Sequence, residues 1–202
     1  MEQPTSNTID VRTVFGSLVE MLDKCISAKE SGEKSLHSLS EDTICFFLAE
    51  SFVRSGASPH SIEMEVRNPT LQEISWTTVD ISIGRTTWIE VKFDKVASRS
   101  HYGKLLIDLF RLALIREGRC LMLYVAPEKM VDLLGKENSR HLSMDSYTPN
   151  AELLDKLPES VEKKLNTPTR RKLHSAKPMI KLIGCRLERS PICLFYEVDA
   201  SN

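Results

Sequence analysis

The chain has 202 residues, of which 41% are hydrophobic and 27% charged, and its formal net charge of -1 excludes a polycation. This composition is ordinary for a globular protein. No apolar run approaches the ~20 residues of a membrane-spanning helix, so we expect no membrane partner. The five cysteines form no CxxC pair and no zinc-like spacing, and the N-terminus lacks a signal-peptide pattern. Together these features favour a reducing, cytoplasmic setting.

The first quarter of the chain predicts two helices. From Val11 to about Lys29, apolar residues recur at the spacing of one helical face. A polar loop follows. Residues 40–55 are rich in apolar side chains, which predicts a second, well-buried helix that ends at Gly56.

Strands dominate the next part of the chain. The segment SIEMEVRN, residues 61–68, alternates between apolar and polar side chains as a strand does. The segments WTTVDISI and TWIEVKF, residues 76–83 and 87–93, flank a Gly-Arg-Thr turn and predict a hairpin.

A helix at 101–117 is the most clearly patterned element, and a short apolar strand at 119–127 follows it. We expect this helix to form a right-handed crossover between the 87–93 strand and the 119–127 strand. A short helix is predicted at 128–135. Residues 136–178 are polar and contain four prolines, which predicts a loop-rich insertion with a small helix near 151–165.

The segments MIKLIGCRLE and ICLFYEV, residues 179–188 and 192–198, predict a second hairpin. The order of these elements predicts the α/β class, with a central mixed β-sheet flanked by helices. The expected divisions are an N-terminal helical segment (1–35), a core (36–135), the insertion (136–178) and a C-terminal hairpin that completes the domain (179–202).

Three charged residues interrupt the first predicted hairpin. Side chains alternate along a strand, so Glu90 and Lys92 share one face of the 87–93 strand, about 7 Å apart. Pairing across the hairpin can bring Asp80 beside Glu90. The apolar residues of the first strand are expected on the face opposite Asp80: Val79, Ile81 and Ile83.

Two adjacent carboxylates repel each other unless a cation neutralises them. Mg²⁺ prefers oxygen ligands and is typically held by one or two carboxylates, and Mn²⁺ can substitute for it. A nearby ammonium can stabilise the charge that develops during hydrolysis of a phosphodiester. The alternative is an exposed polar face on which Asp80 pairs with Arg85 or Lys92.

The pattern of Asp80 followed ten residues later by Glu90-x-Lys92, each half within an apolar strand, resembles the PD-(D/E)xK nuclease superfamily. The resemblance covers roughly residues 38–127 and implies a restriction-endonuclease-like core. Val79 stands where the motif has proline, a position that supplies no ligand.

The resemblance implies a role for each residue of the motif. Asp80 and Glu90 would be metal ligands, with the Val91 carbonyl as a third ligand. Lys92 would position or activate the attacking water. Replacing Glu90 or Lys92 with alanine is then expected to abolish cleavage with little loss of stability.

Members of the superfamily often add a glutamate from the first core helix, and two candidates exist. Glu41 resembles the Ser-Glu start of this helix in small defence-type nucleases, although Ser38-x-x-Glu41 also fits a capping box. Glu50 lies deeper in the helix, where an ion pair with Arg54 is the alternative. We favour Glu41 as the catalytic glutamate.

The 101–117 helix carries a polar stripe. Lys104, Asp108 and Arg111 fall at i, i+4 and i+7, and His101 precedes them on the same stripe. Similar patterns in compact members of the superfamily imply that these residues lie beside the metal and bind a substrate phosphate. The alternative is a ladder of salt bridges on a solvated face.

Residues 163–189 hold nine Lys and Arg residues but one acid, Glu188. This basic segment can follow a nucleic-acid backbone. It lacks interleaved aromatic residues for base stacking, and a flexible, charged loop is the alternative that we favour.

The resemblance therefore implies a Mg²⁺-dependent endonuclease with DNA as its partner, in a restriction or genome-defence role, and it is compatible with a homodimer. Three alternatives remain open. One is a non-catalytic nuclease-fold subunit that binds nucleic acid or an assembly. Another is an RNA-directed or junction-directed nuclease, and the last is an unrelated α/β protein in which the three charges are accidental.

Overall fold

The computed structural model describes residues 9–27, 39–72, 74, 77–130, 146–147, 154, 159, 163, 165–187 and 191–200. The helices in these ranges are α1 (Val11–Ser27), α3 (Glu41–Arg54), α4 (Arg99–Leu112) and α7 (Thr167–Ser175), with short 3-10 turns η1 (Pro59–Ser61) and η2 (Pro69–Leu71). The strands are β1 (Ile62–Arg67), β2 (Thr78–Ile83), β3 (Thr87–Phe93), β4 (Arg119–Ala126), β5 (Ser146–Tyr147), β6 (Pro178–Arg186) and β7 (Ile192–Ala200). None of the helices in these ranges is long and apolar enough to cross a membrane.

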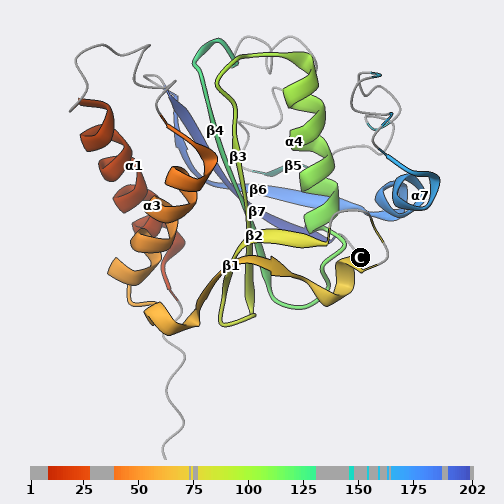
Figure 1. Cartoon of the computed structure of the whole chain (residues 1–202), viewed down its shortest axis with the longest axis horizontal. Coiled ribbons are helices and arrows are strands. Elements are labelled where there is room, and N and C mark those ends of the chain that lie inside the picture. Colours follow the sequence, from red (N-terminus) through yellow and green to blue (C-terminus); the bar gives the residue numbers. More distant parts are fainter. Residues whose placement is uncertain are drawn as a thin grey trace, which may run out of the picture.

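The strands form one sheet in the order β1-β2-β3-β4-β7-β6-β5. β3 and β4 are parallel and are joined through α4, whereas the other neighbouring pairs are antiparallel (Figure 1). β6 and β7 form the predicted second hairpin, which adds to the sheet beside β4. The predicted α/β class with a mixed, helix-flanked sheet is confirmed.

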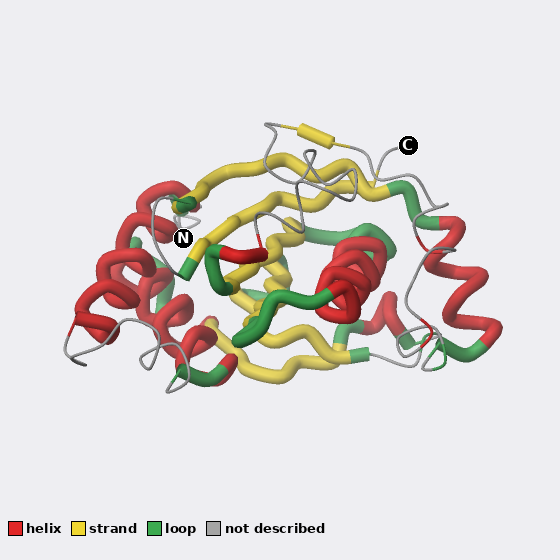
Figure 2. Tube along the Cα trace, turned by 90° about the horizontal axis from the view of Figure 1, so that it is seen from above, coloured by secondary structure: helices red, strands yellow, loops and turns green. Residues whose placement is uncertain are grey.

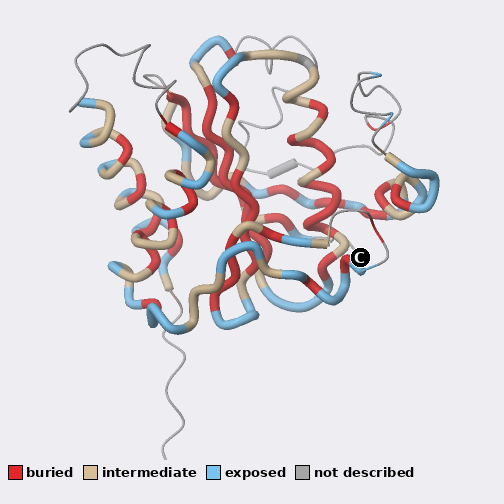
Figure 3. The backbone as a smooth tube through the Cα atoms, viewed as in Figure 1, coloured by how far each residue is buried: buried red, intermediate tan, exposed pale blue. Residues whose placement is uncertain are grey.

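The helices lie on the two faces of the sheet, which separates two apolar cores (Figure 2). α1 and α3 cover one face, where Leu18 and Leu48 pack against Ile89 and other strand residues; we call this the α1/α3 core. α4 and α7 cover the opposite face, where Phe110 and Leu173 belong to the second cluster, the α4/α7 core. The central strands are buried along most of their length (Figure 3).

Helix α4 ends earlier than the sequence predicts. Ser98 caps its start by accepting a hydrogen bond from the His101 N–H at 3.3 Å, and the helix ends at Leu112 rather than near residue 117. The chain then turns back so that Arg119 N–H donates to Thr86 O at 2.7 Å. Gly118 is required in this return because its φ is 91° and a Cβ there would lie 2.4 Å from Thr86 O.

Helix α7 lies within the segment that the sequence assigns to a loop. Asn166 caps it through a 2.9 Å hydrogen bond from Thr169 N–H, and Pro168 occupies its first turn. Thr169 and Leu173 are buried in the fold. The prediction of a flexible charged loop is therefore wrong for residues 167–175, because one buried edge anchors this polar helix. The small helix predicted near 151–165 and most of that at 128–135 fall outside the described residues.

The hairpin of β2 and β3 turns through a loop of residues 84–86, between the paired residues Ile83 and Thr87. Gly84 and Arg85 have φ values of 58° and 56°, the left-handed conformation that short hairpin turns require. Because the turn sets the register, Ile81 pairs with Ile89.

Strand β2 is irregular at Asp80. Ile81 and Ile83 pack in the α1/α3 core, but Val79 packs in the α4/α7 core. The prediction that Val79 shares a face with the other two is therefore wrong. Glu65 of β1 lies opposite Asp80 in this register and has a left-handed φ of 50°, so the ribbon twists strongly at this position.

Candidate functional site

The strands β2 and β3 separate at Asp80. Their paired residues end at Ile81 and Ile89, and the same register places Asp80 opposite Glu90. The next N–H of β3, that of Val91, donates a hydrogen bond to the Asp80 carboxylate at 2.6 Å. A side chain thus replaces the β2 backbone as the acceptor, and the carboxylate of Asp80 is held beside β3.

A second carboxylate also accepts a hydrogen bond from a backbone N–H of β3 in place of the β2 backbone. The Phe93 N–H, two residues beyond Val91, donates to Glu41 Oε2 at 2.9 Å. N–H groups two residues apart point to the same side of a strand, so Asp80 and Glu41 occupy one edge of β3. The opened edge of β3 therefore collects one carboxylate from β2 and one from α3.

Helix α3 brings Glu41, and not Glu50, to this edge. Its N-cap is Ser40, whose hydroxyl accepts from Thr43 N–H at 3.1 Å. Ser38, the first residue of the alternative capping box, lies outside the described residues. Glu50 makes the alternative ion pair with Arg54 at 3.0 Å, at the surface.

Glu90 points to the opposite side of β3 from its apolar neighbours and contacts Arg111 of α4. Arg111 is 4% exposed. The same guanidinium lies 3.5 Å from Asp108 Oδ1 and donates to the Thr78 carbonyl at 3.2 Å. Arg111 therefore joins α4 to both strands of the hairpin, and its buried position excludes the solvated-face interpretation for this residue.

Burial raises the pKa of Asp80 to about 6. The negative charges of Glu41 and Asp108 act in the same direction, and the hydrogen bond from Val91 N–H opposes them. Asp80 consequently ionises less readily than an exposed aspartate.

The pKa of Glu90 is also raised, well above its ordinary value, chiefly by burial. The charges of Asp108 and Asp80 raise this pKa further, whereas the charge of Arg111 lowers it. The ionised form of Glu90 is therefore disfavoured by burial and by its acidic neighbours.

Lys92 lies on the same face of β3 as Glu90, with its side chain 20% exposed and its Nζ 3.7 Å from Glu41 Oε2. Burial alone would lower the pKa of Lys92, but the charges of Asp108, Glu41 and Glu90 outweigh burial and raise it. Lys92 therefore remains an ammonium, which can donate hydrogen bonds but cannot accept a proton.

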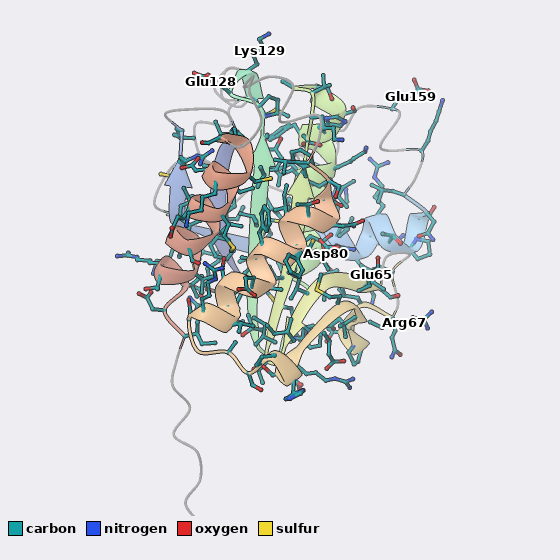
Figure 4. The ribbon with its side chains drawn as sticks, turned by 60° about the vertical axis from the view of Figure 1, so that its left-hand side comes forward. Glu65, Arg67, Asp80, Glu128, Lys129 and Glu159 are labelled. Carbon is teal, nitrogen blue, oxygen red and sulfur yellow. The ribbon has the colours of Figure 1, made fainter. Side chains whose placement is uncertain are left out.

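In the exposed-face alternative Asp80 pairs with Arg85 or Lys92, but each of these side chains forms an ion pair with another acid. Arg85 forms two hydrogen bonds with Glu63, at 3.0 and 3.1 Å. Figure 4 shows Asp80 near Glu65 of the neighbouring strand, while Glu128 and Lys129 lie at the far end of the molecule. Asp80 thus belongs to the group around β3 rather than to the outer surface of the hairpin.

The polar stripe of α4 faces the charged face of β3, and opposite charges meet along it. Arg111 contacts Glu90, and Asp108 interacts with Lys92. Both Lys104 and His101 interact with Asp94, the residue that follows β3. The stripe is therefore beside the motif residues, as the resemblance implies. Binding of a substrate phosphate by Lys104, Asp108 and Arg111 stays a prediction.

Sequence reasoning missed Asp94. It is 3% exposed, accepts a 2.8 Å hydrogen bond from Tyr124 OH, and lies 3.2 Å from His101 Nδ1. The same His101 nitrogen is 2.7 Å from the Val96 carbonyl, so two acceptors surround Nδ1 and it carries the proton. The sequence could have indicated Asp94, because it lies two positions after Lys92, as Lys92 lies two positions after Glu90, and these positions share one face.

The side chains present fit a hard divalent cation. Glu90 Oε2 is buried and has no hydrogen-bond partner among the described residues. Asp80 and Glu90 offer carboxylate oxygens, and Val91 offers a carbonyl at the opened edge of β3. No group of three or more His, Cys, Asp or Glu residues arranged for a metal is found in the described ranges. Two carboxylates completed by water and phosphate are nonetheless a usual Mg²⁺ environment.

Comparison of the chain with protein-family models, with curated proteins and with solved structures finds no match.

Proposed function

We propose that the chain is a metal-dependent nuclease with a restriction-endonuclease-like core, which hydrolyses phosphodiester bonds in DNA with Mg²⁺ or Mn²⁺. Asp80, Glu90 and the Val91 carbonyl would hold the ion. A role in restriction or genome defence is part of the same proposal and rests on the resemblance of the motif alone.

One observation carries this proposal. Asp80 and Glu90 come from adjacent strands and lie in register, and the charge of Asp80 raises the pKa of Glu90. Glu90 Oε2 is buried without a hydrogen-bond partner among the described residues. A buried polar atom of this kind requires an explanation, and a bound cation supplies one.

The residues around this pair have complementary roles. When bound, the ion supplies Lewis-acid stabilisation of the phosphate and lowers the pKa of a coordinated water. Lys92, held charged by its acidic neighbours, orients the attacking water and stabilises the negative charge that grows on the phosphate oxygens. Glu41 keeps Lys92 and the edge of β3 in position through its contacts with both.

A second candidate is a non-catalytic nuclease-fold subunit that binds nucleic acid or an assembly. The contact between Glu90 and Arg111 favours it, because Arg111 already supplies a positive charge to one of the two expected ligands. In that case nucleic acid would bind without metal, and cleavage would not follow.

The test is a cleavage assay with plasmid, linear and single-stranded DNA and with RNA, each in Mg²⁺, Mn²⁺ or EDTA. The proposal expects metal-dependent cleavage of DNA that Asp80→Asn reduces by at least 10³-fold, about 4 kcal/mol of transition-state stabilisation. Asp42→Asn is the matched control, since Asp42 is an exposed aspartate in the first turn of α3 and should leave the rate unchanged.

Cleavage that survives both Asp80→Asn and Glu90→Gln would reject the mechanism. Preferential cleavage of RNA or of branched DNA would keep the site and change the substrate. Binding of DNA without cleavage, unaffected by EDTA, would select the non-catalytic subunit.

A further inference from the structure

Two sets of oxygen atoms share Glu90. One set contains Asp80, Glu90 Oε2 and the Val91 carbonyl, which are the ligands of the proposed ion. The other contains Glu90 Oε1, Asp108 Oδ1 and the Thr78 carbonyl. Each set therefore has two carboxylates and one carbonyl, a combination suited to a hard divalent cation.

The second set is already filled. Arg111 contacts all three of its oxygens through its terminal nitrogens, and it is 4% exposed. A guanidinium is planar, always charged and able to bind several oxygens at once, so it can hold a group of acids where a metal would otherwise be needed. Glu90 is the carboxylate that the two sets share, and it would lie between the guanidinium and the ion.

We propose that Arg111 is a built-in substitute for a second metal ion, so that the site binds a single divalent cation. This inference rests on the proposed function. It also assigns to Arg111 a positioning role, because the guanidinium holds Glu90 Oε1, while Oε2 has no hydrogen-bond partner among the described residues and would be left for the ion. Two-ion nucleases use a pair of metals; here the guanidinium of Arg111 occupies the second set of oxygens.

The number of ions is measured directly, without nucleic acid, by titrating Mn²⁺ and counting bound ions by electron paramagnetic resonance. The natural chain should bind one Mn²⁺. Arg111→Ala should bind two, since it frees Glu90 Oε1, Asp108 and the Thr78 carbonyl. Arg116→Ala removes an exposed cation close to the same helix and should still bind one.

The variant Asp108→Asn tests which of the two sets of oxygens holds the ion, because Asp108 belongs only to the second set. In the natural chain this change should leave the single Mn²⁺ with less than a threefold change in affinity. In the Arg111→Ala chain the same change should reduce the count from two to one. Asp80→Asn should remove one ion in either background.

Each outcome decides a specific point. Two ions in the natural chain would overturn the inference and leave the nuclease proposal intact. No ion in the natural chain, even at millimolar Mn²⁺, would contradict the nuclease proposal itself. If Arg111→Ala does not fold, the natural chain and Asp108→Asn still decide, because loss of the ion in Asp108→Asn would place Asp108 in the occupied set and refute the inference.

Discussion

The two faces of β3 differ sharply in what they pack against. On one face Ile89 and Val91 are almost completely buried in the α1/α3 core, among apolar residues. On the other face Glu90 and Lys92 meet the charged stripe of α4, where Arg111 is buried to a similar degree. The same strand thus supplies a hydrophobic contact on one side and a dense group of charges on the other.

The two faces contribute differently to stability: the apolar face stabilises the fold, and the charged face costs free energy. Apolar burial stabilises the fold in proportion to the area removed from water. Burial of charges costs free energy, which pairing offsets only in part. The raised pKa values of Asp80 and Glu90 record that cost, since burial makes their ionised forms unfavourable. A fold retains such a face where the charges serve a site, and the following predictions test this comparison.

The largest effect is expected on the apolar face. Ile89→Ala should reduce the free energy of unfolding by about 2–5 kcal/mol, because Ile89 has 0% exposure and its truncation leaves a cavity. Urea denaturation measures the loss. Val96→Ala is the control, since Val96 is 58% exposed and should change stability by less than about 0.5 kcal/mol. Equal losses for the two variants would contradict the assignment of the core.

Removal of the Asp80 charge should have the opposite effect and stabilise the fold above pH 6. The folded-state pKa of Asp80 is raised from 3.8 to about 6, so its contribution to stability is fully present below about pH 4 and is lost as pH rises through 6. Without metal, Asp80→Asn should therefore be more stable than the natural chain above pH 6, by about 1–3 kcal/mol.

Thermal unfolding in EDTA between pH 4 and pH 8 measures this difference. It should shrink towards pH 4, where Asp80 is protonated. A difference between Asp80→Asn and the natural chain that is independent of pH would show that charge burial is not its cause.

A smaller effect is expected at the end of the charged face. Tyr124→Phe removes the 2.8 Å hydrogen bond to Asp94 and should cost about 1–2 kcal/mol of stability, because it leaves a buried carboxylate oxygen unpaired. Combining it with Asp94→Asn should cost less than the sum of the single changes. Strict additivity in this double-mutant cycle would mean that the two side chains do not interact.

The smallest effect distinguishes the two glutamates of α3. Glu50→Gln removes an exposed pair with Arg54 and should change stability by about 0.5 kcal/mol or less, with no change in cleavage. Glu41→Gln should instead slow cleavage more than tenfold, because it weakens the contacts with Lys92 and Phe93 N–H. If Glu50→Gln slowed cleavage more than Glu41→Gln, the assignment of the helix carboxylate would be reversed.

Much of the fold was predictable because local patterns carry it. The alternation of apolar and polar side chains predicted β1. The Gly-Arg-Thr turn between two apolar segments predicted the hairpin of β2 and β3. Helix α7 was missed because only Thr169 and Leu173 of its nine residues are buried, which is too few for an apolar period. Val79 was placed on the wrong face because a twist at Asp80 interrupts the alternation of β2.

The motif residues were predictable from spacing, but their contacts were not. Arg111 lies 21 positions after Glu90, and no local pattern predicts which face of α4 will lie over β3. This contact also changes an expectation. Glu90→Ala was predicted to leave stability largely intact, whereas the removal of a buried partner of Arg111 should now destabilise the fold.

The amino-acid sequence by itself determined the strands, the turn and the presence of two acids and a lysine on one hairpin, because these depend on periods of two residues and on turn chemistry. Only the tertiary structure decided that Glu41 and Asp80 take the free N–H groups of β3, and that Arg111 neutralises one side of Glu90. These contacts join segments far apart in the chain. They follow from the way helices pack on the sheet, which no short stretch of sequence encodes.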